Sequence, residues 1–511
     1  MNQPILSSAL VLLITASSLI NAAPRIDYDI DNDGLIEIQD LQDLNEIRNN
    51  VTQMNYSGEA DGFISLELHG DALYGSNDGC PEDGCAGYEL INDLNFDTNL
   101  NEQFDAGDAY WNEGKGWQSI GSFFVKFVGE FHGNGFTLHN LNINRPGERF
   151  VGLFAYSELA HFHDFSLTGH IKAWSDTGAI LGYAWKSQFD HLFADVVIEG
   201  INNEIDCLYN CEANRLGGLV GSSDESVYQQ LVIKTNVSGY NFLGGLVGVS
   251  HADKINEAAI QASIHGYNVL GGLVGQIDNA EIESVFSVVN INGHSSVGGL
   301  IGSSELTTMK NILLSGSVTP GLGTTKYARG GSLVGVIDKD EISKVISLVK
   351  LPIDIEQRHF IGALVGSAYD PRISDTYWAS DLTLREDMFS QNYNLGISQH
   401  FELTDLQCAS QFTNCNGLIF DQFSEPLNLN QQPLWRFGNN TQAPIISLTI
   451  GDFADRNGDG ETDSWPVIEG PTRINNPEPV PEVPATSDST NSGSGSIWFL
   501  LFMIPLFIRR S

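Results

Sequence analysis

The phrase LGGLVG occupies residues 216–221, 243–248 and 270–275, and VGGLIG follows at residues 297–302. Looser copies extend the series in both directions. Aligned on one position of the phrase, the copies give the column Gly152, Ala179, Gly218, Gly245, Gly272, Gly299, Ser332 and Ala363. The intervals along this column are 27, 39, 27, 27, 27, 33 and 31 residues. A recurring period of this length is the sequence signature of a solenoid, in which each repeat stacks on the next.

The residues between the phrases repeat an alternation of apolar and polar positions. Ten residues after the aligned position, the column consists only of apolar residues: Phe162, Phe189, Tyr228, Ile255, Ile282, Met309, Ile342 and Ile373. The next column has no apolar member: His163, Asp190, Gln229, Asn256, Glu283, Lys310, Ser343 and Ser374. Short alternating runs rich in Val and Ile indicate strands. A glycine column at Gly200, Gly239, Gly266 and Gly293 indicates corners that need either a positive φ or close backbone approach.

Three short strands and three turns fit into 27 residues, and each strand can pair in parallel with its copy in the next repeat. The sequence therefore predicts an all-β fold, a right-handed parallel β-helix of about eight coils with small capping segments and a disordered C-terminal linker. A β-propeller is the alternative, but its four-stranded blades generally need about 40 residues or more.

The composition is strongly acidic. Asp and Glu total 64 against 25 Lys and Arg, which gives a formal net charge of −39. Such a surface repels nucleic acid and anionic lipid and attracts cations, calcium above all. We therefore expect no nucleic-acid partner and a calcium-binding protein.

The six cysteines form three close pairs, Cys80 with Cys85, Cys207 with Cys211, and Cys408 with Cys415. None of the spacings is CxxC, and an even count beside an export signal favours disulfides over zinc. Local pairing is the simplest of the possible connectivities. The middle pair lies in the 39-residue interval, which predicts a disulfide-pinned loop projecting from one coil.

Two acidic stretches have the spacing of calcium loops. In the first, Asp29, Asp31 and Asp33 occupy positions one, three and five, Leu35 would offer its carbonyl at seven, and Asp40 takes position twelve. In the second, Asp455, Asn457, Asp459 and Asp463 occupy positions one, three, five and nine, and Glu461 could add its carbonyl. For both, the alternative is a solvated acidic turn without an ion.

The two ends of the chain have the character of sorting signals. Residues 1–23 have an apolar middle followed by small residues, as in a secretory signal peptide. Residues 497–508, IWFLLFMIPLFI, follow a GSGS run and precede two arginines. Neither apolar run is long enough to span a membrane comfortably, so we expect membrane contact only through signal and tail.

The ordered blocks DNDGLIEI (31–38), GYEL (87–90), GNGFTLHNLNI (133–143) and the GGLVG repeats resemble bacterial surface and secreted proteins with GLUG repeats. This resemblance implies a β-helical scaffold and a surface location. Related proteins include adhesins and immunoglobulin-cleaving zinc proteases, but the chain has no HExxH motif, so proteolysis is not implied. The tail resembles the GlyGly-CTERM sorting tail, which implies removal by a sorting protease and display on a Gram-negative cell. A retained tail anchor is the alternative.

The expected organisation follows from these features. The segments are a signal peptide (1–23), a calcium loop and helix (24–55), the N-terminal part of the β-helix with its cap (56–149), the repeats (150–380), a C-terminal cap (381–450), an acidic loop (451–470), the linker (471–496) and the sorting tail (497–511). Trp435 and Phe437 are expected to cover the C-terminal end of the rod, because a solenoid needs caps.

The strongest candidate for chemistry lies where the first two repeats meet. His163 should stack near Asp190, and Asp164 near His191, a set that could serve acid and base catalysis or bind a metal. The alternative is a solvated corner, because the same columns stay polar in every repeat. The sequence therefore favours a non-enzymatic adhesion or binding module for an extracellular protein or glycan, and the alternative is a polysaccharide lyase or hydrolase.

Overall fold

The computed structural model describes residues 28–49, 66–68, 71–73, 80, 85–201, 214–321, 328–351, 360–390, 398–407, 423, 425–436 and 443–463. These residues belong to one compact unit, Met1–Ile474. The predicted signal peptide, linker and sorting tail lie outside the described residues, as do the Cys207–Cys211 and Cys408–Cys415 pairs and Phe437.

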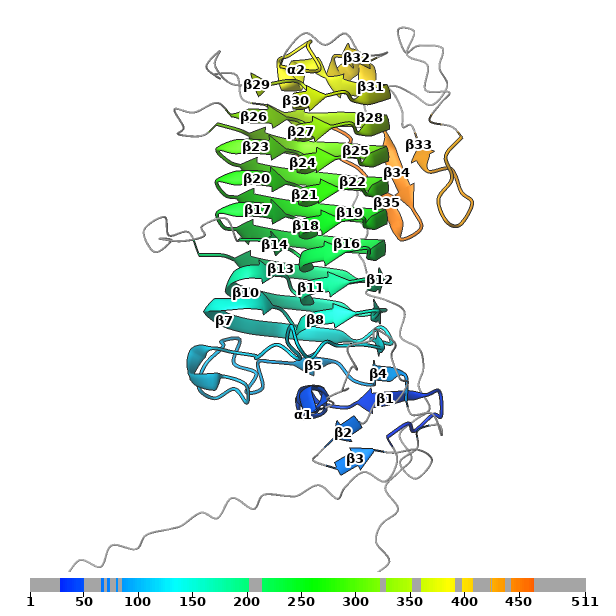
Figure 1. Cartoon of the computed structure of the whole chain (residues 1–511). Helices are drawn as coiled ribbons and strands as arrows, with labels where there is room; N and C mark the ends of the chain where they lie inside the picture. Colours follow the sequence, from blue (N-terminus) through cyan, green and yellow to red (C-terminus); the bar gives the residue numbers. More distant parts are fainter. Residues whose placement is uncertain are drawn as a thin grey trace, which may run out of the picture. The chain divides into compact units, whose positions relative to one another are not determined.

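The described chain winds into a parallel β-helix (Figure 1). One face is an eight-stranded sheet with one strand from each repeat: β8 (Phe154–Glu158), β11 (Leu181–Trp185), β15 (Val220–Asp224), β18 (Val247–His251), β21 (Val274–Asp278), β24 (Ile301–Glu305), β27 (Val334–Asp338) and β30 (Val365–Tyr369). Each strand pairs in parallel with its copies in the adjacent coils, which confirms the fold class predicted from the period.

The remaining coil strands belong to one 22-stranded sheet. Its long strands are β7 (Thr137–Val151), β10 (Ser166–Thr177), β13 (Phe193–Glu199), β16 (Val227–Ser238), β19 (Lys254–His265), β22 (Glu281–Asn292), β25 (Thr308–Thr319), β28 (Glu341–Lys350) and β31 (Arg372–Ala379). Its short strands within the repeats are β9 (His161–His163), β12 (Gln188–Asp190), β14 (Leu216–Gly217), β17 (Asn241–Gly244), β20 (Asn268–Gly271), β23 (Ser295–Gly298), β26 (Arg329–Gly331) and β29 (Phe360–Ile361).

The strand register reproduces the predicted columns. Every neighbouring pair in the apolar column from Phe162 to Ile373 is a register pair, and these side chains are buried. The column also continues toward the N-terminus through Phe131, Tyr88 and Ile36. The strands that carry it are β6 (Glu130–His132), β4 (Gly87–Leu90) and β1 (Leu35–Ile38). The β-helix therefore begins at β1, inside the segment 24–55 that the sequence assigned to a calcium loop and an α-helix, and earlier than the repeats indicate.

The repeated glycines are explained by close packing. A Cβ atom on Gly218, Gly245 or Gly272 would lie 2.1–2.2 Å from a carbonyl oxygen of the next coil, and none of these residues has a left-handed φ. The corners that are left-handed carry other residues, for example Asn279 (φ 54°) and Leu306 (φ 51°). The predicted corner glycines Gly200, Gly239, Gly266 and Gly293 also lack a left-handed φ, and a Cβ there would lie 2.4–2.7 Å from a leucine methyl carbon. The structure therefore rules out positive φ for that column and shows close packing against leucine side chains rather than against backbone.

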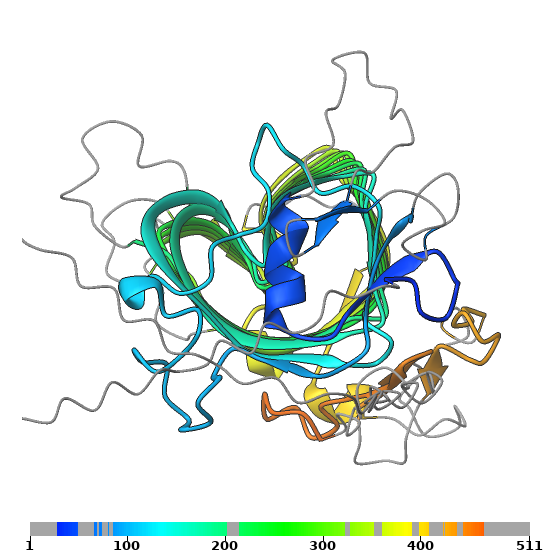
Figure 2. The same ribbon diagram turned by 90° about the horizontal axis from the view of Figure 1, so that it is seen from below.

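The N-terminal end of the β-helix is covered by α1 (Leu41–Glu46), which crosses the opening seen from below in Figure 2. Leu44 and Ile47 are buried there, and the helix continues into η1 (Ile47–Asn49). Further N-terminal elements are β2 (Leu66–Leu68), β3 (Asp71–Leu73), β5 (Leu94–Asn95) and η3 (Asn112–Gly114). Among the described residues, no helix combines the length and apolar character needed to cross a bilayer.

The C-terminal segment packs along the flank of the β-helix, beside β19, β22 and β25 (Figure 1). Trp435 contacts Asn311 and lies in a buried cluster with Phe286 and Leu313, which point outward from the coils. The expectation that Trp435 covers the end of the rod is therefore wrong, because the outer face of these strands is itself apolar and needs covering. The elements are α2 (Ser380–Thr383), β32 (Ser398–Phe401), α3 (Leu403–Leu406), β33 (Trp435–Arg436), β34 (Ile445–Leu448) and β35 (Gly451–Phe453).

Candidate functional site

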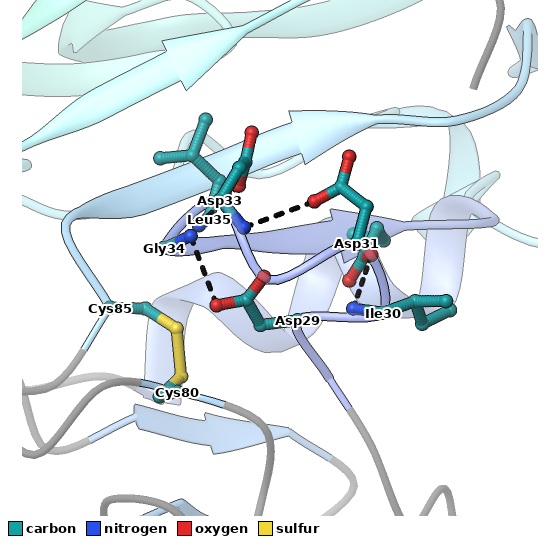
Figure 3. The surroundings of a disulfide bond; sticks show 9 residues. Asp29, Ile30, Asp31, Asp33, Gly34, Leu35, Cys80 and Cys85 are labelled. Carbon is teal, nitrogen blue, oxygen red and sulfur yellow. Dashed lines mark hydrogen bonds between the residues drawn. A yellow bond between two sulfur atoms is a disulfide. The ribbon is translucent and has the colours of Figure 1, made fainter. Parts of the chain in front are cut away.

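The first acidic loop brings its three aspartates together beside the start of the β-helix (Figure 3). One carboxylate oxygen from each of Asp29, Asp31 and Asp33 lies within 4.8 Å of the others. Asp29 Oδ2 accepts a hydrogen bond from the Gly34 amide at 3.0 Å, and Asp31 and Asp33 accept bonds from the amides two residues further on. Residues Asn32 (φ 63°) and Gly34 (φ 93°) supply the left-handed turns that wrap the loop.

Two buried glutamates extend this carboxylate cluster. Glu37 and Glu89 are register partners in β1 and β4, are 2% and 1% exposed, and each offers an oxygen within 4.8 Å of one on Asp31. Burial raises the pKa of Glu89 to about 7, and neighbouring acids add to the rise. The buried atoms Asp29 Oδ1 and Glu89 Oε1 accept no hydrogen bond from the described residues. Such a group of closely spaced buried carboxylates is costly unless protonation or a bound cation neutralises it.

Asp40, predicted at position twelve of the loop, has a structural role at the start of α1. It is the N-cap of α1, and its Oδ1 accepts hydrogen bonds from the amides of Gln42 and Asp43. Glu37 and Glu89 stand near the loop instead of Asp40. The nearby cysteines Cys80 and Cys85 form a disulfide with a Cα–Cα distance of 5.1 Å, which confirms local pairing for this pair.

The second acidic loop has the same internal hydrogen bonds as the first. Asp455 Oδ2 accepts from the Gly460 amide at 2.9 Å, and Asn457 and Asp459 accept from the amides two residues further on. Gly458 and Gly460 take the left-handed positions. Asp463 Oδ2 accepts from the amides of Arg456 and Asn457, while Glu461 donates its amide to Asp459. Asp455 also bonds Ser315 of β25, which ties this loop to the coils.

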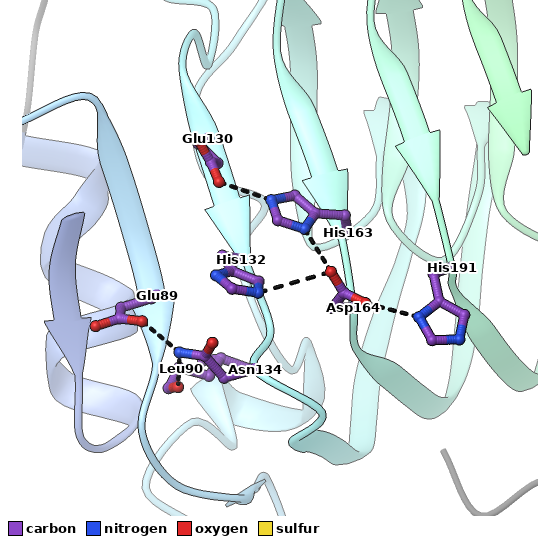
Figure 4. Close-up of polar contacts among 8 residues, drawn as sticks. All are labelled: Glu89, Leu90, Glu130, His132, Asn134, His163, Asp164 and His191. Carbon is purple, nitrogen blue, oxygen red and sulfur yellow. Dashed lines mark hydrogen bonds and ion pairs between the residues drawn. The ribbon is translucent and has the colours of Figure 1, made fainter. Parts of the chain in front are cut away.

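Histidines and carboxylates gather on the outer surface at β6, β9 and β12 (Figure 4). His163 bonds Asp164 through Nδ1 and Glu130 through Nε2, both at 2.7 Å. His191 Nδ1 bonds the other Asp164 oxygen at 2.7 Å, and His132 Nε2 lies 3.6 Å from Asp164 Oδ2. The structure thus brings together His163, Asp164 and His191 as predicted. We call six residues the histidine cluster: Glu130, His132, His161, His163, Asp164 and His191.

The histidines of the cluster differ in the direction of their pKa shifts. Burial opposes a charge on His163, but its hydrogen bonds to Asp164 and Glu130 outweigh burial and raise its pKa to about 9. Burial and the charge of His163 lower the pKa of His132 and of His161. Two carboxylates thus favour the charged form of His163, whereas the rings stacked on it, at centroid distances of 4.3 and 4.2 Å, have lowered pKa values that favour their neutral forms.

Sequence reasoning missed half of this cluster. Asp190 is the register partner of His163 as predicted, but Glu130, His132 and His161 were not identified. The pair Phe131–His132 repeats Phe162–His163 one coil earlier, with Phe131 and His132 in register with Phe162 and His163. Extending the apolar column one coil toward the N-terminus would have found this pair, but the irregular spacing before residue 150 hid it.

A polar strip runs along the outer face of the long strands, across eight coils. Its members are register neighbours and are polar except for Val197: Asn142, His170, Val197, Asn236, Ser263, Asn290, Ser317 and Lys350. All are exposed or half-buried. Two hollows lie along the strip, one at Asn142 and His170 and the other from Asn236 to Lys350. One, of about 370 Å³, lies against Asp97, Glu102 and Phe104, and the other, of about 330 Å³, lies against Asp459 and Glu461.

The fold and these sites define a parallel β-helix protein with acidic loops at both ends of its described chain. Comparison with known proteins adds no relative, because no family model, curated protein or solved structure matches the chain.

Proposed function

We propose that this protein is a secreted, cell-surface β-helix that acts as an adhesion or ligand-binding module and is stabilised by calcium. The observation that carries the proposal is the polar strip. Parallel pairing places amide, hydroxyl and amino groups about 4.8 Å apart along the axis, a spacing that suits an extended polymer rather than a small molecule. The predicted signal peptide and sorting tail support display outside the cell, with a sorting protease acting on the tail.

The chemistry of the strip favours a glycan over an acidic partner. Asn236, Ser263, Asn290 and Ser317 offer neutral donors and acceptors, and the chain as a whole carries a net charge of −39, which repels anionic polymers. A ladder of half-buried rings follows the same strands at their corner, with Tyr240 and Tyr267 stacked at 4.8 Å and Tyr267 and His294 at 4.6 Å. Flat rings beside hydrogen-bonding groups suit sugar recognition.

Binding to immobilised neutral glycans and to extracellular matrix proteins tests the proposal. The variant Asn236→Ala with Asn290→Ala should lose most of its binding, because both residues lie in the centre of the strip. The matched control is Gln276→Ala with Ser303→Ala, on the eight-stranded sheet, which should bind as the wild type does. Equal binding by both variants would rule out the strip as the ligand-binding surface. Cleavage of the glycan by the wild type would instead show that the protein is an enzyme.

Calcium is proposed at both acidic loops, with Asp29, Asp31 and Asp33 as ligands at the first. Support comes from their closely spaced oxygens and from the buried Asp29 oxygen that accepts no hydrogen bond from described residues. Hard carboxylate oxygens are what Ca²⁺ prefers. Bound calcium at about 100 times its dissociation constant would add about 2.7 kcal/mol to stability.

Thermal unfolding in calcium and in EDTA tests this site. We expect EDTA to lower the unfolding midpoint of the wild type, and Asp29→Asn to remove part of that difference. Asp40→Asn is the control, because asparagine is also a good N-cap and Asp40 caps α1. If Asp40→Asn removes the calcium effect and Asp29→Asn does not, the proposed ligand set is wrong.

A further inference from the structure

We propose that Glu130, His132 and His163 form a binding site for a divalent transition-metal ion of the zinc class. One potential ligand atom from each residue lies within 4.8 Å of the other two. The site is separate from the calcium loops and from the polar strip, and it does not depend on the proposed adhesion function.

The donor set points to a borderline metal. Two imidazole nitrogens and one carboxylate oxygen suit Zn²⁺, Ni²⁺ or Cu²⁺, whereas Ca²⁺ and Mg²⁺ prefer oxygen ligands throughout. Zinc bonds to nitrogen and oxygen are about 2.0–2.2 Å long, so three donors around one ion stand about 3–4 Å apart. His163 Nε2 and Glu130 Oε1 are 2.7 Å apart. To form the site, this pair opens so that the ion takes the place of the shared proton, and the His132 ring, which is stacked on His163 at a centroid distance of 4.3 Å, rotates so that one nitrogen faces the ion.

The second nitrogen of His163 already has the partner that metal-binding histidines need. Its Nδ1 bonds Asp164 at 2.7 Å, and the other oxygen of Asp164 is held by His191 at 2.7 Å. Such a carboxylate fixes the ring orientation and increases the basicity of the coordinating nitrogen. Asp164 and His191 are therefore positioning residues, while Glu130, His132 and His163 are the ligands.

The protein backbone holds the three ligands rigidly. Glu130 and His132 both belong to β6, and His132 is the register partner of His163 in β9. Phe131 and Phe162 between them are fully buried in the core. The side chains of His132 and His163 are 14% and 12% exposed, whereas that of Glu130 is 35% exposed. Three protein ligands at a partly open surface leave a coordination position for water or for an external donor group.

Isothermal titration of the metal-free full-length protein with ZnCl₂ at neutral pH, in excess calcium, tests the site. We expect saturable binding to the wild type. His132→Asn and Glu130→Gln should each weaken it about 100-fold or more, and Asp164→Asn, which removes the carboxylate that orients His163, should weaken it about 10-fold to 100-fold. Co²⁺ in place of Zn²⁺ should give a visible absorption band that the ligand variants lose.

The matched control is His251→Asn. His251 also bonds a carboxylate, Asp278, at 2.5 Å, but it lies outside the group of three ligands, so this variant should bind Zn²⁺ as the wild type does. Unchanged circular dichroism of each variant shows that the coils are intact, and Glu130→Gln provides a partly exposed ligand variant if His132→Asn is unstable. Absence of saturable binding to the wild type, or wild-type affinity in folded Glu130→Gln and His132→Asn, overturns the proposal.

Discussion

Adding one methyl group at Gly245 should destabilise the β-helix strongly. Its Cβ would lie 2.1 Å from the Gly272 carbonyl oxygen and 2.9 Å from both Ala262 and Ile260, where ordinary contact begins at 3.4 Å. The coils would have to separate by more than an ångström, although the Gly245 amide donates to that same oxygen at 3.1 Å. Overpacking costs about 1–3 kcal/mol, and a weakened hydrogen bond costs about 1 kcal/mol more.

The reduced entropy of the unfolded chain offsets about 0.4–1 kcal/mol, so we expect Gly245→Ala to cost about 1–3.5 kcal/mol. Because the unfolding entropy of so large a unit is high, this should lower the thermal midpoint by about 1–4 °C, measured by circular dichroism. The control is Gly147→Ala, because a Cβ at Gly147 meets no atom within 4 Å, and that variant should match or slightly exceed the wild type. Equal midpoints for the two variants would refute the close-approach explanation of the glycine columns.

Three further outcomes follow from the packing. Phe286→Ala should remove a fully buried ring that lies 5.8 Å from Phe453, at a cost of about 3–5 kcal/mol. Because the ring points outward, the C-terminal segment should become sensitive to protease while the circular dichroism of the coils persists, and loss of the coil signal would contradict this. Burial raises the pKa of Asp253 to about 7, above the unfolded value of about 3.9. The contribution of protonated Asp253 to the free energy of unfolding is therefore fully present below about pH 4. It is lost as the pH rises from about 4 to about 7, by up to about 4 kcal/mol in total. Asp253→Asn should remove that dependence, so the thermal midpoint of the variant should rise relative to that of the wild type between about pH 5 and pH 8. Parallel midpoint profiles for the two proteins would argue against a raised pKa of Asp253. Leu306→Asn should stabilise the protein by up to about 1 kcal/mol, because Leu306 is 52% exposed with a φ of 51° and asparagine tolerates that conformation better. A lower midpoint in denaturant would count against corner strain.

Sequence periodicity predicted the coils well because identical offsets in a parallel β-helix are spatial neighbours. The columns through Phe162 and His163 are register columns in the structure. Periodicity was a poorer guide outside the repeats. The coils formed by β1, β4 and β6 have unequal lengths, so no fixed offset connects Ile36 with Phe131, although both occupy the same apolar column.

The same limit explains the partial prediction of the sites. The Asp29 loop was visible because its ligands are close in sequence, whereas Glu89 reaches it only through strand pairing with Glu37. Trp435 was placed at the end of the rod because a solenoid needs caps. The sequence gives little warning that the outer faces of β22 and β25 carry Phe286 and Leu313, which need a covering segment.

The polar column, which lies next to the apolar column and contains His163 and Asp190, differs in charge between the two ends of the β-helix. At the N-terminal end it runs through Glu37, Glu89, His132, His163 and Asp190. Parallel pairing sets these groups about 4.8 Å apart, so two buried acids stand side by side, and the imidazoles follow them. Further along, the same column contains Gln229 and Asn256, and then Glu283 beside Lys310 at 3.4 Å.

In the later coils, the polar column therefore contains uncharged side chains or pairs of opposite charge. In the first coils it concentrates carboxylates, whose charge a bound cation would neutralise. Because a solenoid is stabilised by contacts between neighbouring coils, removing a cation from either proposed site would first destabilise β1, β4 and β6. The hard carboxylate cluster and the histidine cluster are adjacent parts of this one column. Because their donor atoms differ, the calcium ion and the zinc-class ion that we propose would stabilise the N-terminal coils without competing for the same ligands.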